Sequence, residues 1–248
     1  MKKFSIFLML LMTFGVPLAM NAQNEMRRER GIVRSQLEPR EIQIVTPLNE
    51  PSRLTLTVNS GNQTNAYIPI PRNSVSTADT ESQFILSASS LSGLVPDGYY
   101  ANITGLSFAS NNQTASLGTY YVLIQEGSFD GSGFFYGVND MVVAYYGTLS
   151  AARGSMSFTF NQLEDGFDYF GGDLLICFYQ TAAGTNTNRL NWYGVTASGM
   201  AAYWNGSNGY LANFLPQTTF TYTNREATCV VPADLDLFTI DKTAAGLY

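Results

Sequence analysis

The 248-residue sequence contains no histidine. This absence excludes Ser-His-Asp and Cys-His nucleophilic systems, and it excludes any zinc site that depends on an imidazole ligand. The two cysteines, Cys177 and Cys229, are too few for an all-thiolate structural zinc site. Because Cys177 lies in an apolar run, we expect a buried thiol there; a disulfide between the two cysteines is the alternative in an exported protein.

Basic residues are scarce in the main part of the chain. Between residues 73 and 224 only Arg153 and Arg189 are basic, against ten acidic residues, so the formal charge of this span is 2 − 10 = −8. Proteins that bind nucleic acids through phosphate contacts need the opposite balance. The composition therefore predicts no nucleic-acid partner.

Long apolar runs are confined to the start of the chain. Residues 1–22 begin with lysines, continue with an apolar stretch and end in a small residue, Ala22. This order is typical of a secretory signal peptide cleaved after Ala22, and Gly15 and Pro17 interrupt the stretch in a way that does not suit a membrane span. The sequence predicts an exported protein without a transmembrane span in the mature chain, located at the cell surface or outside the cell, with the periplasm as the alternative compartment.

From residue 51 onward, apolar residues recur with a period of two. Met156, Phe158 and Phe160 alternate with polar residues, as in a half-buried strand, whereas residues 172–180 are apolar on both faces, as in a central strand. Glycine and asparagine clusters separate many such short runs, and we find no convincing amphipathic helix among them. This pattern predicts an all-β fold, an antiparallel β-sandwich of jelly-roll type, with a bulge at Gly105 where the alternation slips.

Several stretches together resemble the adhesin-like β-sandwich modules of secreted multidomain proteins from Bacteroidetes, which are loosely related to the cleaved-adhesin family. They are FILSASSLSGL, NITGLSF, FDYFGGDLLICFY, WYG and NFLPQTTFTYT. The resemblance covers roughly residues 51–224. It implies a non-catalytic binding module that is secreted or displayed at the cell surface, and it carries over no catalytic residue.

The segments on either side of this domain have a different composition. Residues 23–50 are rich in arginine, and we interpret them either as a solvated leader or as a pro-segment that is cleaved at an arginine. Residues 225–248 resemble a linker and the first strand and a half of a fibronectin type III-like module. This resemblance implies that the chain is a fragment, or a truncated product, of a longer modular protein.

The stretch FDYFGGDLLICFY raises the question of a metal site. Gly171 and Gly172 predict a tight hairpin turn, because glycine tolerates the positive φ that such turns need. The acidic residues around the turn either bond nearby backbone amides, as aspartate commonly does in loops, or bind calcium together with backbone carbonyls. The candidate calcium ligands are Asp165, Asp168 and Asp173.

The stretch MAAYWNGSNGY is the strongest candidate for ligand binding. Sugars are recognised by aromatic rings that stack on their apolar faces and by amides that bond their hydroxyls, and this glycine-rich loop offers both. The alternative is that Trp204 fills a gap at the edge of the sandwich. The candidate ligand-binding residues are Tyr203, Trp204, Asn205, Asn208 and Tyr210.

Carboxylate pairs for glycoside hydrolysis are available in the sequence, Glu126 with Asp130 and Glu164 with Asp168. They lie mostly in glycine-rich turns, where solvent keeps carboxylates in their ordinary state, so we expect no enzymatic activity. The sequence predicts an exported, non-enzymatic, adhesin-like binding module of a surface or secreted multidomain protein. Its expected partner is a glycan or a host or partner protein. The alternative is an accessory domain of a secreted polysaccharide-degrading or proteolytic enzyme.

Overall fold

The structure, a computed structural model, describes residues 52–71, 80–129, 141–185 and 190–227. The predicted signal peptide, the arginine-rich leader, Cys229 and nearly all of the fibronectin-like segment lie outside these residues. Within them, no helix is long and apolar enough to cross a membrane. The only helix among the described residues is the short 3-10 helix η1, Ala88–Leu94, whose first turn is capped by the hydroxyl of Ser87.

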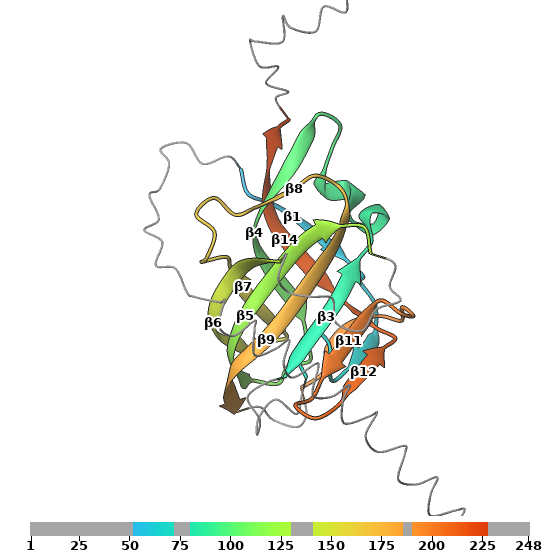
Figure 1. Cartoon of the computed structure of the whole chain (residues 1–248), viewed down its shortest axis with the longest axis vertical. Helices are drawn as coiled ribbons and strands as arrows, with labels where there is room; N and C mark the ends of the chain where they lie inside the picture. Colours follow the sequence, from blue (N-terminus) through green and yellow to red (C-terminus); the bar gives the residue numbers. More distant parts are fainter. Residues whose placement is uncertain (1–51, 72–79, 130–140, 186–189, 228–248) are drawn as a thin grey trace, which may run out of the picture.

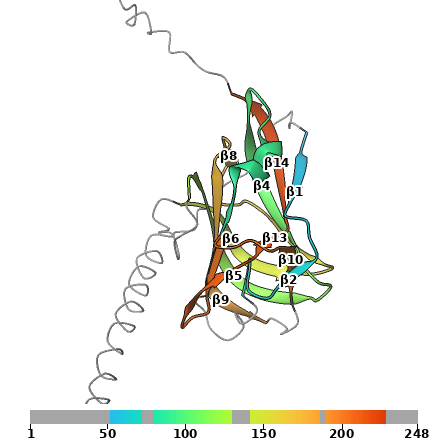
Figure 2. The same cartoon turned by 90° about the vertical axis from the view of Figure 1, so that its right-hand side faces the viewer.

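Two large antiparallel sheets face one another (Figures 1 and 2). The five-stranded sheet has the order β1 (Leu54–Val58), β14 (Thr218–Glu226), β4 (Tyr99–Ala109) and β7 (Ser155–Thr159), and β8 (Phe167–Tyr169) also pairs with β4. The six-stranded sheet has the order β12 (Gly209–Ala212), β11 (Ala201–Trp204), β3 (Glu81–Leu86), β9 (Asp173–Thr185), β5 (Ala115–Gly127) and β6 (Val142–Ala151). A small three-stranded sheet has the order β13 (Leu215–Pro216), β10 (Trp192–Val195) and β2 (Gln63–Asn65).

The order of the strands is that of a jelly roll. Its eight core strands in chain order are β1, β3, β4, β5, β6, β7, β9 and β14. The five-stranded sheet contains the first (β1), eighth (β14), third (β4) and sixth (β7) of these strands. The six-stranded sheet contains the second (β3), seventh (β9), fourth (β5) and fifth (β6). Strands that follow one another in the chain therefore tend to lie in opposite sheets, as two Greek keys require. The predicted all-β antiparallel sandwich is confirmed.

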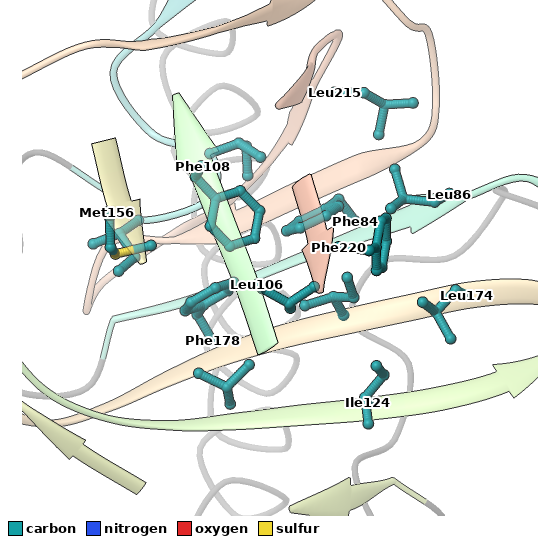
Figure 3. Packing of buried hydrophobic residues seen from close by; sticks show 14 of the residues in the cluster. Phe84, Leu86, Leu106, Phe108, Ile124, Met156, Leu174, Phe178, Leu215 and Phe220 are labelled. Atoms are coloured by element: carbon teal, nitrogen blue, oxygen red, sulfur yellow. The ribbon is translucent and has the colours of Figure 1, made fainter. Parts of the chain in front are cut away.

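The core between the two sheets is apolar and rich in aromatic rings (Figure 3). Phe84 of β3 and Phe178 of β9 meet Phe108 of β4 edge to face, with ring centroids 6.0 and 5.5 Å apart. Edge-to-face pairs place the positive ring edge against the negative ring face, which adds to the gain from burying apolar area. Phe84 and Phe178 lie in one sheet and Phe108 in the other, so these contacts hold the layers together.

Two sequence expectations about backbone geometry have opposite outcomes. The bulge beside Gly105 is confirmed, because the register of β4 against β14 shifts between Thr221 and Tyr222. The prediction of a hairpin at Gly171 and Gly172 is wrong, because the strands on either side do not pair with one another. β8 pairs with β4, whereas β9 pairs with β3 and β5 in the other sheet. The two glycines therefore form a crossover between sheets. The positive φ of Gly171, 113°, serves that crossover.

Candidate functional site

The predicted ligand-binding loop folds into a β-hairpin made of β11 and β12 at one margin of the six-stranded sheet (Figure 1). The Asn205 side chain shapes its turn, because its Oδ1 accepts hydrogen bonds from the backbone N–H groups of Ser207 (3.1 Å) and Asn208 (2.9 Å). Gly206 takes up the positive φ, 91°, that this tight turn needs. Asn205 therefore acts in the fold, since its acceptor oxygen is used within the loop.

Strand alternation divides the predicted residues between two faces of the hairpin. Tyr203 is paired with Tyr210 across the strands, so the two side chains share one face, and Trp204 projects to the other. Tyr210 is 41% exposed, whereas Trp204 is only 1% exposed. The prediction that Trp204 binds ligand is therefore corrected: it packs inside the protein, which was the alternative interpretation. Asn208 is exposed in the turn, directly before β12 begins at Gly209.

A third ring, which the sequence did not indicate, completes this surface. Tyr67 stacks on Tyr203 with ring centroids 4.5 Å apart and planes 7° apart, and Tyr203 stacks on Tyr210 at 5.2 Å and 21°. The Oδ1 atom of Asn65 holds the segment of Tyr67 by accepting hydrogen bonds from the N–H groups of Tyr67 and Ile68. We call Tyr67, Tyr203 and Tyr210 the tyrosine stack. No sequence signal connects Tyr67 to the hairpin, because the contact depends on the tertiary fold.

The surroundings of Tyr203, the middle ring of the stack, favour its neutral hydroxyl. Burial raises the pKa of Tyr203 above its ordinary value, and the neighbouring hydroxyls of Tyr67 and Tyr210 raise it further. Each neutral phenol can both donate and accept a hydrogen bond. The stack therefore offers polar ring edges together with the outer ring face of Tyr210, which is the end of the stack that Tyr203 does not cover.

The three aspartates of the proposed calcium site have separate environments. Asp168 accepts a hydrogen bond from Nδ2 of Asn102 (2.7 Å), Asp173 accepts one from the N–H of Ala88 (2.8 Å), and Asp165 is exposed. Among the described residues, no three acidic, cysteine or histidine side chains form a group that could hold a metal ion. The calcium hypothesis is therefore corrected, because the acids of this stretch face different neighbours once β8 and β9 enter different sheets.

Glu126 holds the crossover between the sheets. Its two carboxylate oxygens accept hydrogen bonds from the N–H groups of Phe170 (2.9 Å) and Gly172 (2.6 Å), while the Tyr169 hydroxyl donates to the carbonyl oxygen of Gly172 (2.6 Å). Burial, followed by the charges of Glu126 and Asp173, raises the pKa of Tyr169 far above its ordinary value. Glu126 thus has a clear role in stabilising the fold. Asp130, its partner in the predicted carboxylate pair, lies outside the described residues.

A second polar cluster lies on the outer face of the six-stranded sheet. Nε2 of Gln83 donates to Oε1 of Glu81 (3.0 Å), and Sγ of Cys177 lies 3.8 Å from the same oxygen. All three side chains are buried, so the prediction of a buried thiol at Cys177 is confirmed. A ligand cannot reach this cluster in the conformation that the structure describes. The tyrosine stack, whose outermost ring Tyr210 is 41% exposed, is therefore the better candidate site.

Comparison with known proteins adds little to this geometry. No protein-family model matches the chain, and no curated protein matches it in sequence. A solved structure of the cysteine protease and lectin-like domains of Cwp84, a surface layer associated protein of Clostridium difficile, aligns with a TM-score of 0.32 and 8% identity. The alignment covers 59% of this chain and 32% of that one. A likeness this weak carries no functional argument, so the site is interpreted from its own residues.

Proposed function

We propose that this domain is an exported, non-enzymatic binding module of a surface or secreted protein and that it binds a glycan at the tyrosine stack. The observation that carries the proposal is the stack of Tyr67, Tyr203 and Tyr210, which runs from a ring packed on the core to Tyr210, 41% exposed on the β11–β12 hairpin. Export follows from the predicted signal peptide in residues 1–22.

The chemistry of this face supports a sugar as its ligand. A pyranose ring has an apolar face of C–H groups, which can stack on the ring of Tyr210, the most exposed of the three tyrosines at 41%. Its hydroxyls need partners that donate and accept, and the phenols and the exposed Asn208 amide are of that kind. The site offers no charged side chain among residues 200–213, which favours a neutral ligand.

A glycan-array screen of the chain from residue 23 to residue 248 tests the proposal, with Tyr210→Ala as the informative variant. Tyr210 is half exposed at a strand edge, so its truncation should leave the fold intact, which a circular-dichroism melt checks. Phe170→Ala is the matched control, because Phe170 is 66% exposed and stacks on Tyr100 rather than on the tyrosine stack.

We expect the Tyr210→Ala variant to lose at least tenfold in apparent affinity, which corresponds to about 1.4 kcal/mol, and the Phe170→Ala variant to bind normally. Chelating calcium should change nothing, since the acids proposed as ligands are not gathered. Glycan binding that survives in the Tyr210→Ala variant would place the site elsewhere. If the folded protein binds no glycan on the array, the sugar proposal fails and a protein partner becomes the better hypothesis.

A further inference from the structure

The outer edge of β12 presents backbone groups that can pair with another strand. β12 is the terminal strand of the six-stranded sheet, and no described strand pairs with it on the side away from β11. The N–H of Asn205 donates to the carbonyl oxygen of Asn208 (3.1 Å), which fixes the alternation of the hairpin. By this alternation Tyr203 and Tyr210 exchange hydrogen bonds with one another. The N–H and C=O groups of Gly209 and Leu211 therefore point away from β11, toward the open margin.

This margin lacks the features that usually protect a sheet edge. Natural edge strands carry charged residues, prolines or bulges that discourage pairing with another chain. Residues 200–213 contain no charged residue and no proline, and the register of β11 against β12 is regular. Leu211 is 50% exposed and Tyr210 is 41% exposed. The edge is therefore apolar, extended and free of charge in a domain whose body is otherwise strongly acidic.

We propose that two copies of this chain associate through antiparallel pairing of their β12 strands. The geometry specifies a register with the twofold axis beside Tyr210. Gly209 of each copy then forms a hydrogen-bonded pair with Leu211 of the other, and Tyr210 faces its own counterpart as a non-hydrogen-bonded pair, with Cα atoms about 4.5 Å apart. Such a contact is self-complementary, as a twofold dimer requires.

The tyrosine stack gives a reason why a second copy fits this edge well. Stacked rings within one copy are already spaced by 4.5 and 5.2 Å, close to the distance between neighbouring strands, which is about 4.8 Å. A β12 strand from a second copy would place an identical ring at the next step of the stack, against the outer face of Tyr210. Leu211, on the opposite face, would lie beside Gly209 of the second copy, where no side chain obstructs it.

Charge does not oppose association at this edge. The span from residue 73 to residue 224 carries a formal charge of 2 − 10 = −8, so two copies repel one another at most approaches. The β11–β12 hairpin adds nothing to this repulsion. At the opposite margin of the same sheet β6 is also uncharged, but there the side chain of Asn161 bonds the backbone N–H and C=O of Tyr146. In the other large sheet, the edge strand β1 begins next to Arg53 and contains no aromatic residue. We therefore assign the pairing to β12 and use β1 as the control.

Sedimentation velocity on residues 23–248, over about 1–100 µM, tests the dimer directly, since micromolar affinity is what a small interface supplies. The wild-type protein should show a concentration-dependent dimer. Leu211→Glu should weaken it at least tenfold, because it places a charge of the same sign as the body at the interface. Leu54→Glu is the matched control, since Leu54 is 39% exposed on β1, and it should dimerise as the wild type does.

A second variant separates a lost interface from a lost fold. Leu211→Pro removes an N–H that points away from β11, so the hairpin keeps its internal hydrogen bonds while the intermolecular pair loses a donor. This variant should be folded by circular dichroism and monomeric. A wild-type protein that stays monomeric over the whole range, or dimers that form equally well in both Leu211 variants, would overturn the proposal. Neither readout involves a glycan, so the outcome is independent of the proposed function.

Discussion

The carboxylate of Glu126 offers a sharp test of how the two sheets are joined. Glu126→Gln keeps the length of the side chain but replaces one accepting oxygen with an NH₂ group, which then faces a backbone N–H. One of the two hydrogen bonds to Phe170 and Gly172 is lost, and the other changes from a charged to a neutral acceptor. A hydrogen bond to a charged group contributes about 1.5–3 kcal/mol, and Glu126 is half-buried, so we expect a loss of about 2 kcal/mol in the free energy of unfolding.

Thermal unfolding followed by far-ultraviolet circular dichroism measures this loss. For a domain of this size about 1 kcal/mol corresponds to about 2–4 °C, so Tm should fall by about 4–8 °C. Glu164→Gln is the control, because Glu164 is exposed in the loop before β8, and its Tm should stay close to that of the wild type. A Glu126→Gln variant as stable as the Glu164→Gln variant would refute the assignment of Glu126 as the residue that holds the crossover.

Because burial and the charges of Glu126 and Asp173 raise the pKa of Tyr169, the unfolded chain releases this proton first, and stability should fall as the pH rises above 10. In the Tyr169→Phe variant the free energy of unfolding, measured by urea titration, should fall less steeply with pH. The difference in slope should be up to about 1.4 kcal/mol per pH unit. Trp204→Ala should lower the stability by about 3–5 kcal/mol, seen as a lower urea midpoint, because it empties a buried site. A glycan stacked on Tyr210 should weaken the dimer in sedimentation by mass action, since both use the same ring face.

The sequence was sufficient to predict the fold class because the sandwich depends on alternation. Met156, Phe158 and Phe160 alternate with polar residues, and the structure places β7 in the five-stranded sheet, with Met156 and Phe160 buried and Phe158 packed against them. Residues 174–179 are buried on both faces of the central strand β9, as an uninterrupted apolar run requires. These features are local, because each strand specifies which of its faces is covered.

Which sheet a strand joins depends on residues far away in the chain, and the sequence led to a wrong prediction on this point. Gly171 and Gly172 permit a sharp change of direction, but they do not determine whether the next strand returns to its neighbour or crosses to the other sheet. The decision depends on distant residues such as Glu126, which bonds the crossover. The calcium hypothesis failed for the same reason, because it assumed that Asp168 and Asp173 lie on one hairpin.

The β11–β12 hairpin shows how one short stretch can contribute to both the fold and the site. Strand alternation puts the buried Trp204 on one face of the hairpin and Tyr203 and Tyr210 on the other, where Tyr203 packs against the core and Tyr210 is 41% exposed. Composition alone gave Trp204 and the tyrosines equal weight, because all are aromatic and adjacent. Their separation follows only from the pairing of Tyr203 with Tyr210, and this pairing also decides which backbone groups of β12 point outward. The same register therefore defines the ring face offered to a ligand and the edge offered to a second copy, so the two interactions should oppose one another.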